Sequence, residues 1–206
     1  MAMQSQYPYR QIRADFDNDT ITVYQAYSRD IADAAVREQK LNASPKFKLG
    51  RMTWVKPSWA WMMYRAGYSY KDHGQARILA LKMKHEDFLS LLENGTLSTH
   101  TSQAQTVSPG TVRIQWDPER TPSLKMLPYR SIQIGIGASL SETWATKWIV
   151  SIDDVTDRAQ KLKHTLDTNP EMSLHRLVEL GVVPLERPYQ VPEQLMKRLE
   201  MTPLET

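Results

Sequence analysis

The segment 51–67 constrains the fold more than any other part of the chain, because it encodes a strand that runs directly into a helix. A short apolar run precedes Lys56, and the residue before Pro57 is biased toward extended backbone. We therefore expect a strand that ends near Lys56. Pro57 suits the first turn of a helix, Ser58 suits its cap, and Gly67 suits the position just past its end.

The expected helix carries an apolar stripe at helical spacing, which predicts that this face packs in the core. Its members are Trp59, Met62, Met63 and Ala66. A strand that enters a helix leaves backbone N–H groups pointing outward, and these donors and the helix dipole favour anions. We expect Ser58 at this helix start, and the cations Arg51, Lys56 and Arg65 around it, to bind phosphate groups.

Positive charge is concentrated in the second quarter of the chain, although the whole chain carries a formal charge of only +3. The segment 46–84 contains nine Lys or Arg residues against one acid, Asp72, and therefore carries +8, so the rest of the chain carries −5. Such asymmetry indicates a surface suited to the phosphates of a nucleotide or a nucleic acid. A solvated charged face is the alternative.

The composition excludes several classes of protein and site. The absence of cysteine excludes disulfides, thiolate metal sites and cysteine nucleophiles. No apolar run approaches the roughly 20 residues of a membrane span, and the N-terminus lacks the apolar core of a signal peptide. We expect a cytoplasmic protein without membrane contact. The five histidines are scattered without the spacing of a metal site, so we predict no metal.

Strand and helix patterns alternate along the chain without a strict βαβ rhythm. An alternating β-branched and aromatic run at 20–27 predicts a strand, and 131–136 predicts another. The last third reads as helices separated by proline-bearing turns. We expect an α+β fold with a mixed or mostly antiparallel sheet flanked by helices, in one domain over 12–206 after a loose leader over 1–11. The Ser/Thr/Gln-rich segment 96–110 is expected to be a loop, and a lid role for it is left open.

Two further groups of residues are candidates for binding and catalysis. Asp117 and Glu119 follow the expected strand 112–116, where a carboxylate is available for acid–base or electrostatic work. A hairpin return would bring Arg130 and Gln133 near them. A simple solvated turn is the alternative for the two acids. Tyr24, Gln25 and Tyr27 at the end of the first strand are suited to stack on or hydrogen-bond a ring, although core packing is expected for one of the two tyrosines.

Several blocks of the sequence resemble one known family. They are Ile21–Ser28, Arg51–Ser58, Trp61–Arg65, Gln115–Arg120, Tyr129–Gly135, Trp148–Val150 and Asp154–Thr156. In this order they are similar to the bacterial and fungal family catalogued as domain of unknown function 4291, over roughly residues 12–192. The sequence departs from the family mildly, with Trp59-Ala60 where Phe-Leu is expected and Tyr68 where Trp is common. The resemblance implies a family and no activity.

Two functions remain as hypotheses. In the first, the protein is an enzyme that acts on a phosphate-bearing nucleotide, by fold-level analogy with ADP-ribosyltransferases that use NAD. Arg51, Lys56 and Ser58 then hold phosphates, while Glu119 or Gln133 stabilises developing positive charge. In the second, the protein binds RNA or DNA without catalysis, through the basic segment 46–84 and exposed aromatic rings.

Overall fold

The fold was analysed in a computed structural model that describes residues 7–98 and 112–203. The strands are β1 (Arg13–Ala14), β2 (Thr20–Tyr27), β3 (Thr53–Val55), β4 (Arg77–Lys84), β5 (Gly95–Leu97), β6 (Val112–Arg120), β7 (Met126–Ile136), β8 (Ile149–Asp154) and β9 (Arg187–Pro188). The longer helices are α1 (Arg29–Glu38), α2 (Trp59–Ala66), α3 (His85–Glu93), α5 (Thr156–Thr168), α6 (Leu174–Glu179) and α7 (Glu193–Arg198). Short helical turns, η1 (Gly67–Ser69), η2 (His73–Gln75), η3 (Ala138–Leu140), α4 (Ser141–Thr143) and η4 (Trp144–Trp148), connect them.

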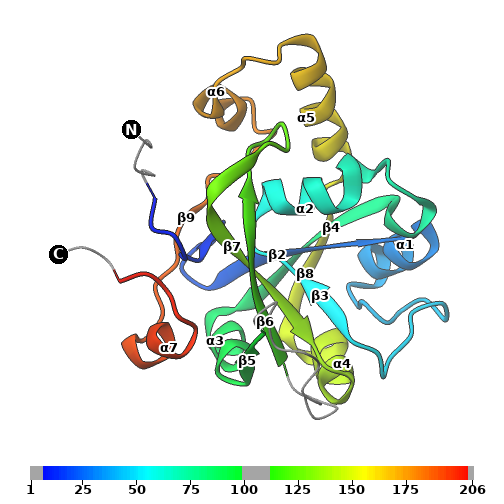
Figure 1. The fold of residues 1–206 in the computed structure, drawn as a ribbon. Coiled ribbons are helices and arrows are strands. Elements are labelled where there is room, and N and C mark those ends of the chain that lie inside the picture. Colours follow the sequence, from blue (N-terminus) through cyan, green and yellow to red (C-terminus); the bar gives the residue numbers. More distant parts are fainter. Residues whose placement is uncertain (1–6, 99–111, 204–206) are drawn as a thin grey trace.

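The strands form three sheets, which confirms the expected α+β fold in one domain (Figure 1). A three-stranded antiparallel sheet has the order β2-β4-β8, and a four-stranded sheet has the order β3-β7-β6-β5. Only the β5–β6 pair is parallel within the described residues. The third sheet joins β1 near one end of the chain to β9 near the other. The sheets are therefore mostly antiparallel, as expected.

Most expected elements lie where the sequence predicts them. β2 matches the predicted strand 20–27, and α2 begins after Ser58 and ends at Gly67, whose φ of 55° is left-handed. The predicted apolar stripe of α2 is buried, with Trp59, Met63 and Ala66 fully inaccessible. Trp61, outside the predicted stripe, is also buried, so α2 packs on more of its surface than the apolar spacing predicted.

The strand β6 differs from the prediction, because it continues through Arg120 instead of ending at residue 116. Asp117 and Glu119 are therefore strand residues and not part of a turn. Proline is tolerated inside this strand because β5 pairs only with residues 112–114, which leaves the outer edge of β6 open at Pro118. A register shift between Pro118 and Arg120 accommodates the ring.

The expected leader and loop lie partly outside the described residues. Residues 1–6 are not described, but Arg10 at the end of the expected leader is held by Thr202: its N–H donates to Thr202 Oγ1 at 2.9 Å. Ile12 is fully buried. Of the expected loop 96–110, the structure describes only 96–98, where Thr96 and Leu97 belong to β5. The lid hypothesis lies outside the described residues.

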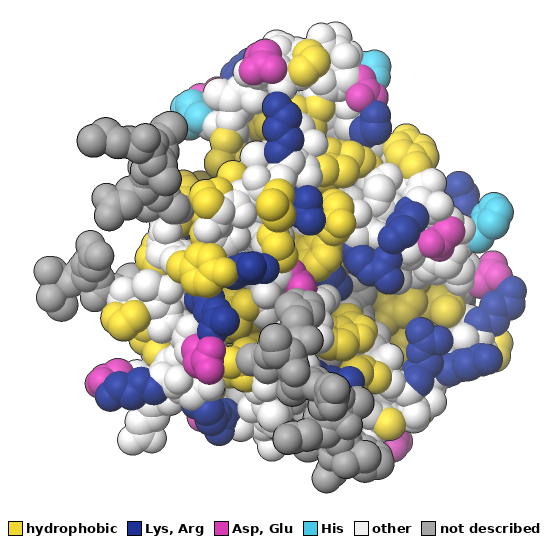
Figure 2. Space-filling model, viewed as in Figure 1, with side chains coloured by type: hydrophobic (Ala, Val, Ile, Leu, Met, Phe, Trp, Pro, Cys, Tyr) yellow, Lys and Arg dark blue, Asp and Glu magenta, His cyan; other side chains and the backbone are white. Residues whose placement is uncertain are grey.

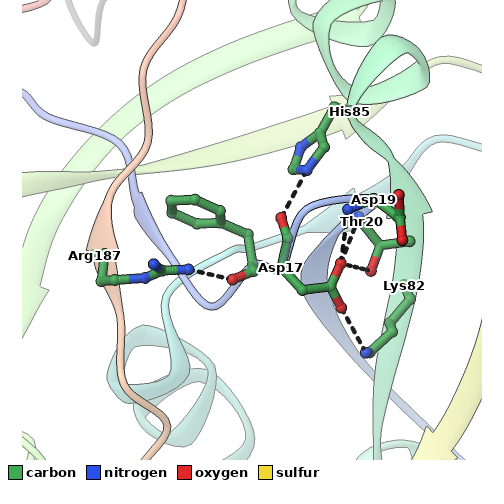
Figure 3. A network of polar contacts seen from close by, with 7 residues as sticks. Asp17, Asp19, Thr20, Lys82, His85 and Arg187 are labelled. Atoms are coloured by element: carbon green, nitrogen blue, oxygen red, sulfur yellow. Dashed lines mark hydrogen bonds and ion pairs between the residues drawn. The ribbon is translucent and has the colours of Figure 1, made fainter.

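A polar network fixes the turn that leads into β2 (Figure 3). One carboxylate oxygen of Asp17 accepts hydrogen bonds from the backbone N–H groups of Asp19 and Thr20, at 3.0 and 2.7 Å. These bonds hold the pKa of Asp17 well below its usual value. The other carboxylate oxygen accepts from Lys82 of β4 at 3.2 Å, and the Asp17 carbonyl is 3.0 Å from His85 Nε2 of α3. The start of β2 is thereby tied to its neighbours.

Candidate functional site: a polar cavity between two sheets

The two larger sheets meet at a single bridge and then separate. Tyr24 of β2 and Lys56, just after β3, exchange backbone hydrogen bonds of 2.7 and 3.3 Å. Beyond this bridge the Gln25 side chain spans the gap between the strands. Its Nε2 donates to Thr53 Oγ1 at 2.7 Å and to the Trp54 carbonyl at 3.0 Å, and its Oε1 accepts from the Tyr27 hydroxyl at 2.8 Å.

A cavity of about 600 Å³ opens at this separation, a size common for small-molecule sites. Its walls come from the ends of β2 and β3, from α2, from the η2 turn and from the polar side of β6 and β7. Figure 2 shows dark-blue Lys and Arg side chains gathered around a hollow to the right of the centre. Arg51 and Lys56 both line this cavity, so the two predicted anchors share one site.

Lys56 is the buried cation of the cavity. The residue is only 3% exposed, and its Nζ lies 5.6 Å from the centre of the Trp61 ring. Burial lowers the pKa of Lys56 from 10.5 to about 8, and the positive charge of Arg65 acts in the same direction. Asp117 opposes the shift. Lys56 therefore carries its charge at neutral pH but is poorly hydrated, which strengthens its attraction for an anion.

The floor of the cavity is the part of the polar face of β6 and β7 that carries Gln115 and Gln133. The apolar side chains of these strands, such as Ile114 and Ile134, pack in the larger core cluster on the opposite face. Gln115, Asp117 and Glu119 alternate along β6 and so share the polar face. In β7, Gln133 lies opposite Gln115, and its Nε2 donates to Gln115 Oε1 at 2.8 Å.

Two acids, the buried Glu119 and the half-buried Glu186, occupy the start of α2, where a ligand phosphate was expected. Ser58 caps the helix by accepting from the Trp61 N–H at 3.1 Å and donates to Glu119 Oε1 at 2.9 Å. The Trp59 N–H donates to Glu186 Oε1 at 2.6 Å. Burial raises the pKa of both glutamates, that of Glu186 to about 8. The donors at this helix start are thus occupied by the protein's own carboxyl groups.

The structure divides the predicted site residues into two groups. Gln25, Arg51, Lys56, Arg65 and Gln133 line the cavity, whereas Tyr24, Ser58, Asp117, Glu119 and Arg130 do not. The amide of Gln25 is engaged by protein partners, so its role is to hold β2 against β3.

Each residue outside the cavity has a local reason for its position. The Tyr24 ring is 1% exposed and packs on Trp59 with ring centres 5.2 Å apart, which confirms core packing for one tyrosine. Arg130 lies opposite Pro118, on the other face from Gln133, and its Nε donates to the Tyr9 hydroxyl at 2.9 Å. The hairpin return was predicted, but strand alternation turns Arg130 away.

Some cavity residues were not identified from the sequence. Lys48, Trp54 and Gln115 line the cavity, together with Asp72 and Gln75 at the η2 turn. The alternation of Gln115, Asp117 and Glu119 at every second position was the available signal for a polar strand face. No comparable sequence signal pointed to Trp54, because a half-buried tryptophan in a short strand is an ordinary core residue.

The described residues contain neither a metal-ligand cluster nor a membrane-spanning helix. In the ranges 7–98 and 112–203, no group of three or more His, Asp or Glu side chains is arranged to hold a metal ion. None of the helices in these ranges combines the length and apolar character needed to cross a bilayer.

Comparison with known proteins places the chain in a family. None of the curated proteins matches it. The family model described as Domain of unknown function (DUF4291) matches residues 11–189, which include every residue of the cavity wall. The protein belongs to the DUF4291 family.

Proposed function

We propose that the protein is an enzyme that binds a phosphate-bearing nucleotide in the cavity between the two sheets and acts on it there. The observation that carries the proposal is the charge of the wall. Among the described residues that line it, four are cations and one is an acid, Asp72. The cations are Lys48, Arg51, Lys56 and Arg65.

The arrangement of these cations suits a phosphate or diphosphate group. Arg51 and Arg65 are exposed, and their guanidinium groups are suited to bind phosphate oxygens in pairs. Lys56 adds a buried charge beneath them. A concave site with one sign of charge concentrates anions from solution. It suits a small nucleotide better than an extended nucleic-acid strand.

Gln133 is the best-placed candidate for the chemical step. In the NAD-dependent version of the proposal, the bond between ribose C1′ and the nicotinamide nitrogen breaks. Nicotinamide leaves with the bonding electron pair, and water or another nucleophile adds to C1′ and loses a proton. In this version the amide oxygen of Gln133, which lines the cavity, would stabilise the positive charge that develops on the ribose. Glu119 is less suited to this role, because Ser58 and the Arg120 N–H already bind its Oε1.

A melting-temperature screen tests the proposal. Pyrophosphate, ribose 5-phosphate, ATP, NAD and a short RNA are compared as ligands, and a nucleotide present at 100 times its Kd stabilises the fold by about 2.7 kcal/mol. We expect Lys56→Met to weaken nucleotide binding at least tenfold, because the buried charge is lost. Lys125→Met, at an exposed lysine of the β6–β7 hairpin, removes the same charge away from the cavity and serves as the control.

The pH dependence gives a second readout. Because the pKa of Lys56 is about 8 in the free protein, the affinity of wild type for a nucleotide should fall as the pH rises above 8. The Lys56→Met variant should not show this fall. Unchanged nucleotide binding by Lys56→Met would refute the proposal. Binding of RNA that weakens steeply with salt, with no response to free nucleotides, would favour the nucleic-acid-binding alternative.

A further inference from the structure

The Trp54 side chain lies flat on the sheet at one side of the cavity. Trp54 of β3 is paired with Gly135 of β7. A Cβ atom placed on Gly135 would lie 3.0 Å from three atoms of the six-membered ring of Trp54, which is too close for a relaxed contact. The absence of a side chain at Gly135 therefore lets the indole pack this closely over β7, and a Cβ there would push the ring away by a few tenths of an ångström. The tryptophan is half-buried and lines the cavity, so part of it is accessible there.

An amide pair lies next to this indole on the same face. Val55 is paired with Ile134, so continuing the register by one residue places Lys56 opposite Gln133, which is paired with Gln115. The Gln133–Gln115 pair lies two residues further along β7 than the Trp54–Gly135 pair. Two residues span about 6.6 Å along a strand. An aromatic ring stacked on Trp54 would thus present its edge to the two glutamines.

The glutamine pair presents one donor group and one acceptor group. The bond from Gln133 Nε2 to Gln115 Oε1 does not use the Oε1 of Gln133 or the Nε2 of Gln115. If both amides are turned over, one amide still offers a carbonyl oxygen and the other an NH₂ group. Nucleobases carry neighbouring donors and acceptors on their edges, whereas sugars and inorganic phosphates have no planar face for the indole.

We propose that Trp54, Gln115 and Gln133 form a nucleobase subsite, so that the ligand of the cavity is a nucleoside phosphate that stacks its base on Trp54. This inference rests on the proposed function, because the cations of the same cavity hold the phosphate. It adds that the base is recognised, by stacking on one face and by hydrogen bonds at one edge. Gln133 then binds the base and replaces the ribose role considered for it in the NAD-dependent version. The close Trp54–Gly135 contact, the amide pair and the cations are three separate features of one cavity.

The wild-type protein provides the first test. Dissociation constants are measured by calorimetry for ribose 5-phosphate, AMP, GMP, CMP and UMP. We expect at least one nucleotide to bind about tenfold or more tightly than ribose 5-phosphate, which has the same sugar and phosphate without a base. If ribose 5-phosphate binds as tightly as every nucleotide, the base subsite is refuted while the phosphate site stands. If none of the five ligands binds, both proposals fail.

Variants test which residues cause the tighter binding of a nucleotide than of ribose 5-phosphate. In Trp54→Leu the advantage of the best nucleotide over ribose 5-phosphate should disappear, with ribose 5-phosphate affinity kept within about threefold. Gln115→Glu should change the ranking of the four nucleotides, because a carboxylate replaces the NH₂ group by an acceptor. Trp148→Leu is the control, since Trp148 packs against the larger core cluster and is not a cavity residue. A nucleotide preference that survives in Trp54→Leu and Gln115→Glu would overturn the subsite.

Discussion

At the scale of single residues, the most unusual feature is the pair of acids at the start of α2. Glu119 and Glu186 are bound to adjacent groups, the Ser58 hydroxyl and the Trp59 N–H, and the negative charge of Glu119 adds to the raised pKa of Glu186. Two such acids favour a state in which one keeps its proton at neutral pH. The charge at this helix start is therefore coupled to pH.

The raised pKa of Glu186 predicts how the stability of the fold depends on pH. Its pKa is about 8 in the folded protein, above the ordinary 4.5. Between these values the folded state binds more protons than the unfolded state, so stability falls as the pH rises from about 5 to 8. We expect Glu186→Gln to reduce this fall, measured as the melting temperature over that range, by roughly 5 °C.

An exposed glutamate provides the comparison. Glu171→Gln changes the same side chain at an exposed position between α5 and α6 and should keep the slope of wild type. Equal slopes for Glu186→Gln and wild type would show that Glu186 does not hold a proton across this range.

At the scale of elements, the serine caps of α1 and α2 differ in what the hydroxyl does. The Ser58 side chain accepts from the Trp61 N–H and donates to buried Glu119. The Ser28 side chain at the start of α1 makes no capping hydrogen bond. Both serines precede a helix and have extended backbone. The local sequence therefore does not show which of the two makes a capping hydrogen bond.

Because only Ser58 makes a capping hydrogen bond, replacing each serine by alanine should destabilise the fold by different amounts. Ser58→Ala should lower the free energy of unfolding by about 2 kcal/mol, because it removes a helix cap and a partner of a buried acid. Ser28→Ala should cost only about 0.3 kcal/mol, since no bond is lost. Urea denaturation of the two variants gives the comparison, and equal costs would mean that the Ser58 bonds contribute little.

At the scale of the molecule, the fold has two apolar clusters that share one sheet. β2 and β4 direct Val23, Leu79 and Leu81 into the larger cluster and Tyr24 and Ile78 into the smaller one, by strand alternation. Loss of either cluster would therefore expose one face of the same strands.

This shared sheet predicts cooperative unfolding. Trp144 lies in the larger cluster and Trp59 in the smaller one. In urea, the fluorescence of the Trp59→Phe and Trp144→Phe variants, each of which keeps one of these two reporters, should change at the same denaturant concentration as the far-UV circular dichroism of that variant. A difference of more than about 0.5 M between the fluorescence and circular-dichroism midpoints of either variant would indicate that the clusters unfold separately.

The sequence by itself determined the elements with a strong local signal. β2, the boundaries of α2 and the buried stripe on α2 follow from apolar spacing, a serine cap and a left-handed glycine, all of which act within a few residues. It left open whether Arg51 and Lys56 share a pocket, which the structure answers by placing both in the cavity wall. Local patterns are reliable where short-range sterics and one-sided burial decide the conformation.

Only the tertiary structure decided which side chains face the cavity. Pro118 and two acids look like a turn in the sequence, but the pairing of β6 with β7 makes them part of a strand. That pairing also turns Gln133 toward the cavity and Arg130 away from it. Partners from distant segments occupy the start of α2 and the amide of Gln25. Such contacts depend on strand register and on residues far apart in the chain, which no local pattern encodes.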